Sequence, residues 1–126
     1  MKYQYDSNYT PPAPTLDLYL SVPEHGTMIG PLSGIIDTGA DGTLIPTHYL
    51  KQLSATPVDD AWVRGQWGEW QPVLMYMVDL RVDAIIMPGL YVVGDALGDE
   101  IVLGRNYLNR LRLLLDGPAA ISELLG

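Results

Sequence analysis

Ile35-Ile36-Asp37-Thr38-Gly39-Ala40-Asp41 is the stretch of this chain that decides its fold. Two β-branched apolar residues, which favour a buried strand, run directly into an Asp-Thr-Gly turn. The pattern predicts that the carboxylate of Asp37 lies at the end of that strand, on a tight backbone corner with little side-chain bulk. The alternative is an ordinary turn, in which an aspartate side chain bonds only to its own backbone.

The Asp-Thr-Gly triplet occurs once in the 126 residues. Hydrolysis of a peptide bond by carboxylates needs two of them, one that accepts a proton from water and one that donates a proton to the amide. A single copy in so short a chain therefore predicts that a second, identical chain supplies the second carboxylate. The two would share a proton and titrate as a pair, because facing carboxylates cannot both ionise cheaply.

The chain carries two separated motifs. The first runs from Ile35 through the Asp-Thr-Gly turn to Pro46, and the second is Ile101-Val102-Leu103-Gly104-Arg105-Asn106-Tyr107-Leu108. Together they resemble the retroviral-type, or retropepsin-like, aspartic proteases, which are single-domain, homodimeric relatives of pepsin. The resemblance covers residues 15–125. It implies a closed, barrel-like, all-β acid protease fold with one or two short helices, and an aspartic endopeptidase that acts on peptides or proteins as a homodimer without a cofactor.

The resemblance assigns roles within the first motif. Asp37 is the catalytic acid and base, while Thr38, Gly39 and Ala40 form the active-site loop around it. Thr38 is expected to hydrogen-bond across the dimer axis, and Gly39 lets the substrate backbone approach closely. The alternative is an inactive retropepsin-like dimerisation or peptide-binding module in which the same loop is only structural, because one fold can host several functions.

The second motif is implied to support this loop. In the family, its glycine lets the late segment pack under the active-site loop, and that glycine is Gly104 here. Its arginine pairs with the aspartate two residues after the catalytic glycine, so the resemblance implies an ion pair between Arg105 and Asp41. The alternative is a solvated, unpaired Asp41.

The turn Gly65-Gln66-Trp67-Gly68 lies where the family carries its flap, a mobile hairpin that closes over substrate. Glycines at both ends of the turn favour a bending tip. Three tryptophans cluster here, and in an alternating hairpin Trp62 and Trp70 would pack inward while Trp67 lies at the tip and contacts substrate. The alternative is that all three are ordinary core or cross-strand residues.

The rest of the chain is organised as one domain of short strands, residues 15–126, preceded by an arm, residues 1–14. Leu16, Leu18 and Leu20 alternate with polar residues, which is typical of a half-buried strand. Between residues 73 and 82 the apolar positions change from odd to even numbers, so we expect a bulge that shifts the buried face. The arm is rich in Tyr and Pro and is expected to be extended: disordered, draped over the surface, or crossing to a partner subunit.

Composition argues against several partners. With seven Lys and Arg against 15 Asp and Glu, the net charge is −8, and no basic patch is available to bind nucleic acid. No apolar run approaches the roughly 20 residues of a membrane helix, so a membrane is not expected as a partner. The absence of cysteine excludes disulfides and thiol catalysis, and it fits a reducing cytoplasm.

A metal site is not expected either. Asp37-x-x-x-Asp41-Gly42 partly resembles a calcium-binding loop, but Gly39 offers no side-chain oxygen, and His48 stands where that loop requires glutamate. The two histidines, His25 and His48, lack the spacing of a zinc site. A monomeric metal-binding β-domain is therefore disfavoured.

Overall fold

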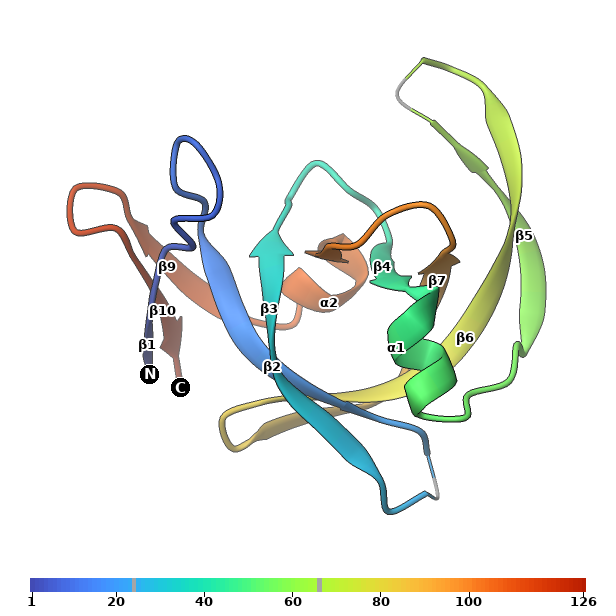
Figure 1. Ribbon diagram of the computed structural model, residues 1–126. Helices are drawn as coiled ribbons and strands as arrows, with labels where there is room; N and C mark the ends of the chain where they lie inside the picture. Colours follow the sequence, from blue (N-terminus) through green and yellow to red (C-terminus); the bar gives the residue numbers. More distant parts are fainter. Residues whose placement is uncertain (24, 66) are drawn as a thin grey trace.

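The computed structural model of the chain describes residues 1–126 except Glu24 and Gln66. Strands dominate the described residues, and two short helices interrupt them (Figure 1). In chain order the elements are β1 (Lys2–Gln4), β2 (Thr15–Ser21), β3 (Met28–Ile36), β4 (Thr43–Pro46), α1 (Thr47–Gln52), β5 (Asp59–Arg64), β6 (Trp70–Val82), β7 (Ile85–Asp95), β8 (Ile101–Leu103), α2 (Arg105–Leu108), β9 (Arg112–Asp116) and β10 (Ile121–Leu125). No helix among the described residues is long and apolar enough to cross a membrane.

Six of these strands close into a barrel. Their order is β2-β3-β8-β4-β7-β6, and β6 returns to pair with β2 over Tyr19, Leu20 and Ser21. The pairs β3–β8 and β4–β7 are parallel, whereas β2–β3 and β6–β7 are antiparallel. The predicted closed, barrel-like, all-β fold with short helices is confirmed.

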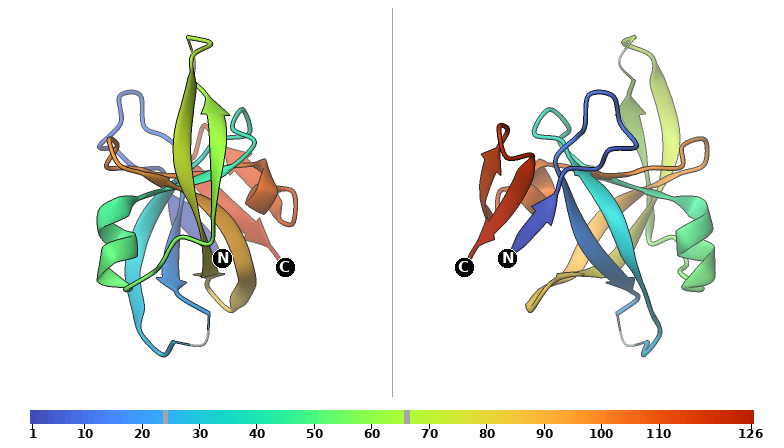
Figure 2. Two further views of the ribbon diagram at one scale, coloured as in Figure 1. Left: turned by 90° about the vertical axis from the view of Figure 1, so that its right-hand side faces the viewer. Right: turned by 60° about the vertical axis from the view of Figure 1, so that its left-hand side comes forward.

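A long hairpin extends the sheet beyond the barrel. β5 pairs only with β6, from Asp59 opposite Met75 to Arg64 opposite Trp70. This β5–β6 hairpin projects from the same end of the barrel as the loop between β3 and β4, and the loop between β1 and β2 reaches that end too (Figures 1 and 2). Three segments far apart in the sequence therefore surround one end of the molecule, which we call the loop end.

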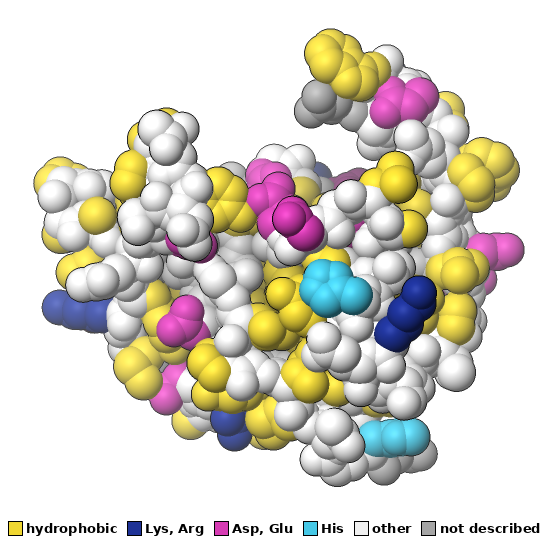
Figure 3. Space-filling view, viewed as in Figure 1, with side chains coloured by type: hydrophobic (Ala, Val, Ile, Leu, Met, Phe, Trp, Pro, Cys, Tyr) yellow, Lys and Arg dark blue, Asp and Glu magenta, His cyan; other side chains and the backbone are white. Residues whose placement is uncertain are grey.

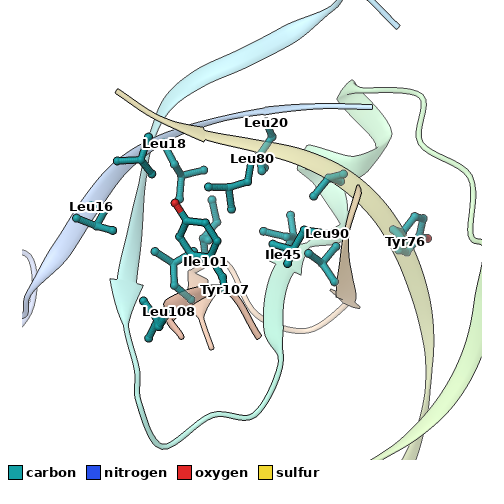
Figure 4. Packing of buried hydrophobic residues seen from close by; sticks show 14 of the residues in the cluster. Leu16, Leu18, Leu20, Ile45, Tyr76, Leu80, Leu90, Ile101, Tyr107 and Leu108 are labelled. Carbon is teal, nitrogen blue, oxygen red and sulfur yellow. The ribbon is translucent and has the colours of Figure 1, made fainter. Parts of the chain in front are cut away.

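Alternate strand residues fill the barrel. In β2, Leu16, Leu18 and Leu20 are fully buried, while Asp17 between them is exposed. Burial of each leucine contributes about 2 kcal/mol to stability. Tyr107 of α2 lies in the same core, close to these leucines (Figure 4).

Tyr107 anchors the short helix α2. Its side chain is fully buried, and its hydroxyl oxygen has no hydrogen-bond partner among the described residues. Burial raises the pKa of this hydroxyl above its ordinary value. Leu108 is also buried, so Tyr107 and Leu108 pack one side of α2 against the core. Arg105 and Asn106, at the start of the helix, contact the loop between β3 and β4.

β6 keeps one buried face through its barrel half, which corrects an expectation from the sequence. The register against β7 does shift between Val78 and Leu80, but the extra residue lies on β7, near Gly89. Gly89 has φ +62° and donates its N–H to the carboxylate of Asp79 (2.9 Å). The more buried residues of β6 do change from odd numbers in the hairpin, where Val73 and Met75 are half-buried, to even numbers in the barrel. The expected bulge belongs to the neighbouring strand β7, so its predicted place within β6 is wrong. The buried residues of β6 all have even numbers: Tyr76, Val78, Leu80 and Val82.

The N-terminal arm has partners within its own chain. β1 pairs antiparallel with β10, which pairs with β9, and the three form a separate small sheet. The following loop is closed by two backbone bonds, from the N–H of Asp6 to the carbonyl of Ala13 (2.8 Å) and from the N–H of Ala13 to the carbonyl of Asp6 (3.1 Å). The arm is thus a paired strand and a closed loop, and the division into residues 1–14 and 15–126 stays a prediction.

Candidate active site

The loop between β3 and β4 begins where β3 ends. Only Gly34 of that strand is buried, and Ile35 and Ile36 are half-buried, so the expected buried strand is covered only in part. Ile35 and Ile36 pair in parallel with β8, and the N–H of Asp37 donates to the carbonyl of Leu103 (3.1 Å). The strand ends there, and the N–H of Ala40 returns to the carbonyl of Asp37 (3.2 Å) to close a turn. The Asp-Thr-Gly turn itself is exposed at the loop end.

The Asp37 side chain folds back on this turn. Its Oδ1 accepts a hydrogen bond from the N–H of Gly39 (2.9 Å), and a Cβ added to Gly39 would lie only 3.1 Å from that oxygen. Glycine therefore leaves room for the carboxylate beside the backbone. The carboxylate is fixed relative to its own loop yet open to solvent, which both catalysis and an ordinary turn allow.

Gly104 lies directly beneath the loop, as the second motif implies. It is buried, and a Cβ on it would collide with the backbone of Gly42, whose nitrogen would lie 3.0 Å away. Its N–H donates to the hydroxyl of Thr43 (3.1 Å). The two backbones therefore approach so closely that only glycine fits at this position.

The start of α2 donates hydrogen bonds to three carbonyl groups of the loop. The N–H of Arg105 donates to Ala40 (2.8 Å), the N–H of Asn106 donates to Asp41 (3.2 Å), and Nη1 of Arg105 donates to Thr38 (2.9 Å). The guanidinium thus contacts the backbone of the loop. An ion pair between Arg105 and the exposed Asp41 side chain is not found in the described part of the chain, and that pairing stays a prediction.

Thr43 and Asn106 complete this support, and sequence reasoning missed both roles. The fully buried Thr43 hydroxyl donates to Oδ1 of Asn106 (2.7 Å), and Nδ2 of Asn106 donates to the carbonyl of Tyr91 (2.9 Å). Together with Gly104, the network ties β4, β7 and α2 under the loop. The available signal was a polar residue opening an otherwise apolar strand, since a buried hydroxyl needs a partner.

Comparison with known proteins identifies the fold. No protein-family model matches the sequence, and no curated protein matches it. A retropepsin-like aspartic protease from Rickettsia conorii matches with a TM-score of 0.67 and 12% sequence identity, covering 98% of this chain and 88% of that chain. EIAV protease in complex with the inhibitor HBY-793 matches with a TM-score of 0.59 and 19% identity, covering 78% of this chain and 86% of that chain. The chain has the retropepsin-like fold.

Among the described residues, the backbone hydrogen bonds at the tip of the β5–β6 hairpin lie within its own turn. The N–H of Gly65 donates to the carbonyl of Glu69 (2.8 Å), and the N–H of Gly68 donates to Gly65 (3.0 Å). Gly68 has φ +85°, a conformation that favours glycine. Trp67 is 85% exposed, and Gln66, which the sequence places in the same site, lies outside the described residues.

The neighbouring tryptophans do not pack inward. Trp62 and Trp70 are 66% and 62% exposed, so the expected inward orientation is wrong, and so is a core position for either. They are cross-strand residues of an open hairpin, with Trp62 opposite Pro72 and Trp70 opposite Arg64. The alternation was misjudged because the half-buried face of the hairpin is formed by smaller residues such as Val63 and Val73.

A pocket of about 480 Å³ lies beneath this hairpin, and sequence reasoning did not predict it. Its lining comes from β4, α1, β5, β6, the end of β7 and the loop that follows β7. Asp37 is not among the lining residues, so the pocket is separate from the Asp-Thr-Gly turn.

The loop between β7 and β8 is tied to the arm. The hydroxyl of Tyr9 donates a hydrogen bond to the carboxylate of Glu100. That hydrogen bond, followed by partial burial and the charge of Glu100, raises the pKa of Tyr9 to about 12. Among the described residues, no group of three or more His, Asp or Glu side chains is arranged to hold a metal ion.

Proposed function

We propose that the chain is one half of a homodimeric aspartic endopeptidase, with Asp37 of each subunit supplying one of the two catalytic carboxylates. One observation carries this proposal: an exposed Asp37 on a turn whose carbonyl groups are bonded from below by Arg105 and Asn106. The retropepsin-like fold supports it. Such a rigid turn can present its carboxylate to a symmetry-related copy without reorganisation.

In this mechanism the two carboxylates share one proton and hold a water molecule between them. The ionised carboxylate accepts a proton from the water as it attacks the scissile carbonyl carbon, and the protonated one donates its proton to the carbonyl oxygen. The carboxyl group that took the proton from water then donates it to the leaving amine, and the other carboxylate takes back a proton from the diol as the C–N bond breaks. No covalent intermediate forms, and no cofactor takes part. Thr38 and Gly39 flank the carboxylate, so their backbone lies beside the peptide.

The β5–β6 hairpin serves as the flap in this proposal. It projects at the loop end (Figure 2). Its residues line the pocket, and among the described residues the hydrogen bonds at its tip stay within the turn itself. Gly65 and Gly68 provide bending points at the tip, which allow the hairpin to close over an extended peptide and exclude water.

The test compares cleavage by the wild-type chain with cleavage by Asp37→Asn. Denatured protein is incubated with micromolar enzyme between about pH 3 and pH 8, and new termini are identified by mass spectrometry. Asp37→Asn should reduce the rate by about 10³-fold or more, because an amide cannot shuttle the proton. Asp83→Asn, in the exposed turn between β6 and β7, makes the same charge change and should keep full activity.

Assembly is measured separately by sedimentation. Activity should fall with the square of dilution below the dimer dissociation constant, and a statine-type inhibitor should block it. Full activity in a monomer would contradict the shared site. A dimer that cleaves nothing across this pH range would support the inactive dimerisation or peptide-binding module, since Asp37 already closes an ordinary turn with Gly39.

A further inference from the structure

The pocket beneath the hairpin has mainly apolar walls. Leu44 of β4, Tyr76 of β6 and Val93 of β7 contribute to it on the barrel side, and Val63 and Val73 contribute from the hairpin. Methyl and aromatic groups of this kind favour the aliphatic part of a ligand side chain.

The register of the barrel gives the separation of this pocket from the catalytic turn. Leu44 pairs with Val102 of β8, and Val102 pairs with Ile35, two residues before Asp37. Two strand spacings separate β4 from β3, which is about 10 Å. An extended peptide rises about 3.3 Å per residue, so a peptide that runs across these strands spans about three residues between the strand that carries Asp37 and Leu44 of the pocket.

A fixed carboxylate also lines the pocket. Oδ1 of Asp95 accepts hydrogen bonds from the N–H groups of Leu97 (3.1 Å) and Gly98 (2.9 Å). A Cβ on Gly98 would collide with this carboxylate, so glycine is what allows the side chain to lie there. The turn sets the direction of Asp95, and Oδ2 accepts no hydrogen bond within the described part of the chain.

The surroundings of the pocket are negatively charged. Asp60 lines it together with Asp95, and none of its described lining residues is Lys, Arg or His. Asp99 and Glu100 follow in the loop between β7 and β8. Figure 3 shows acidic side chains gathered in the middle of the loop end, between the β1–β2 loop and the hairpin. With a net charge of −8 on the chain, this end attracts cationic peptides.

We propose that this pocket selects a lysine or arginine side chain of the substrate, about three residues from the scissile bond. The inference rests on the proposed peptidase function. The aliphatic stem of the basic residue lies along Leu44, Val73 and Val93, and its cationic head reaches the carboxylate of Asp95. An apolar residue fills the walls equally well but leaves that carboxylate without a partner as water is excluded.

The experiment uses two peptides that differ at one position, lysine or norleucine, three residues from the cleaved bond. Binding is measured by fluorescence anisotropy in the Asp37→Asn background, so it does not depend on hydrolysis. Adding Asp95→Asn should weaken binding of the lysine peptide by about 10- to 100-fold and leave the norleucine peptide unchanged. Asparagine keeps an oxygen for the N–H groups of Leu97 and Gly98, so the turn is preserved.

The control variant is again Asp83→Asn, which removes one charge far from the pocket. Equal binding of the two peptides, or equal weakening by Asp95→Asn and Asp83→Asn, would overturn the proposal and leave the peptidase function standing. Cleavage by the wild-type chain tests that function independently. Selective binding of the lysine peptide without any cleavage would support the pocket assignment and overturn the peptidase.

Discussion

The loop between β3 and β4 and the tip of the β5–β6 hairpin are both glycine-containing turns at the loop end, but the rest of the chain holds them differently. The first is bonded from below by α2 and lies in backbone contact with Gly104, more than 60 residues later in the sequence. Among the described residues, the hydrogen bonds of the second link Gly65, Gly68 and Glu69. Glycine therefore serves close packing in one turn and conformational freedom in the other. The difference predicts a rigid Asp37 turn beside a hairpin that can move.

The largest effect is expected for Gly104→Ala. The added methyl group collides with the backbone of Gly42, which cannot move without breaking the turn around Asp37. We expect a loss on the order of 3 kcal/mol in the free energy of unfolding, measured by urea denaturation. Gly117→Ala is the matched control, because nothing lies within 4 Å of the added Cβ. If both variants unfold like the wild type, the loop is not packed on α2 and the comparison fails.

The two turns also differ in how far they could be predicted from the sequence. The strand that delivers Asp37 follows from two β-branched residues before a turn, and the place of Gly104 beneath the loop followed from the second motif. The bonds from Arg105 to the carbonyl of Thr38, and from Thr43 to Asn106, could not be predicted, because they depend on contacts between distant segments. The local sequence pattern therefore predicts where the turn lies. The hydrogen bonds that support the turn depend on tertiary packing.

The hairpin shows the opposite case. Its strands and glycine tip were expected, but the orientation of the tryptophans was wrong because alternation along a strand does not say which of its two faces is covered. The odd-numbered apolar residues of β6, such as Val73, were assigned to a shifted core face, whereas Val73 lines the pocket. Binary patterns do not distinguish a core from an apolar pocket, since both select the same side chains.

Thr43→Val tests whether the support of the Asp37 turn depends on hydrogen bonds as well as close packing. Valine has the same shape, but it leaves the N–H of Gly104 and the side-chain oxygen of Asn106 without a partner. We expect a loss of about 2 kcal/mol in the free energy of unfolding. Thr56→Val, at an exposed position, should change it little. If Thr43→Val leaves the free energy of unfolding unchanged, close packing alone holds the turn in place.

Tyr9→Phe tests the loop between β7 and β8, whose support lies between those of the two turns. A single side-chain hydrogen bond, from the Tyr9 hydroxyl to the Glu100 carboxylate, joins this loop to the N-terminal arm. Because the folded-state pKa of Tyr9 is raised from 10.0 to about 12, its contribution is present below pH 10 and is lost as pH rises through 12. Tyr9 is half-buried but its partner Glu100 is exposed, so we expect only a few tenths of a kcal/mol at neutral pH. The difference in unfolding free energy between wild type and Tyr9→Phe should shrink across that alkaline window. Tyr5→Phe is the control, and a difference that is constant with pH would contradict the bond.

The smallest effect on stability is expected for Trp67→Ser at the hairpin tip. With 85% of the residue exposed, the indole loses almost no contacts within the chain when it is removed, so the free energy of unfolding should change by less than about 0.5 kcal/mol. Leu80→Ala, at a fully buried position, should cost about 3 kcal/mol in the same urea titration and shows that the assay detects lost packing. The second readout is peptide cleavage. A rise in KM with unchanged stability would mean that the tip meets the substrate when the hairpin closes. A loss of more than 1 kcal/mol that depends on protein concentration would mean that Trp67 packs against the second subunit. In that case the second subunit supports the hairpin tip. The contrast between this tip and the well-supported Asp37 turn would then hold only for the isolated chain.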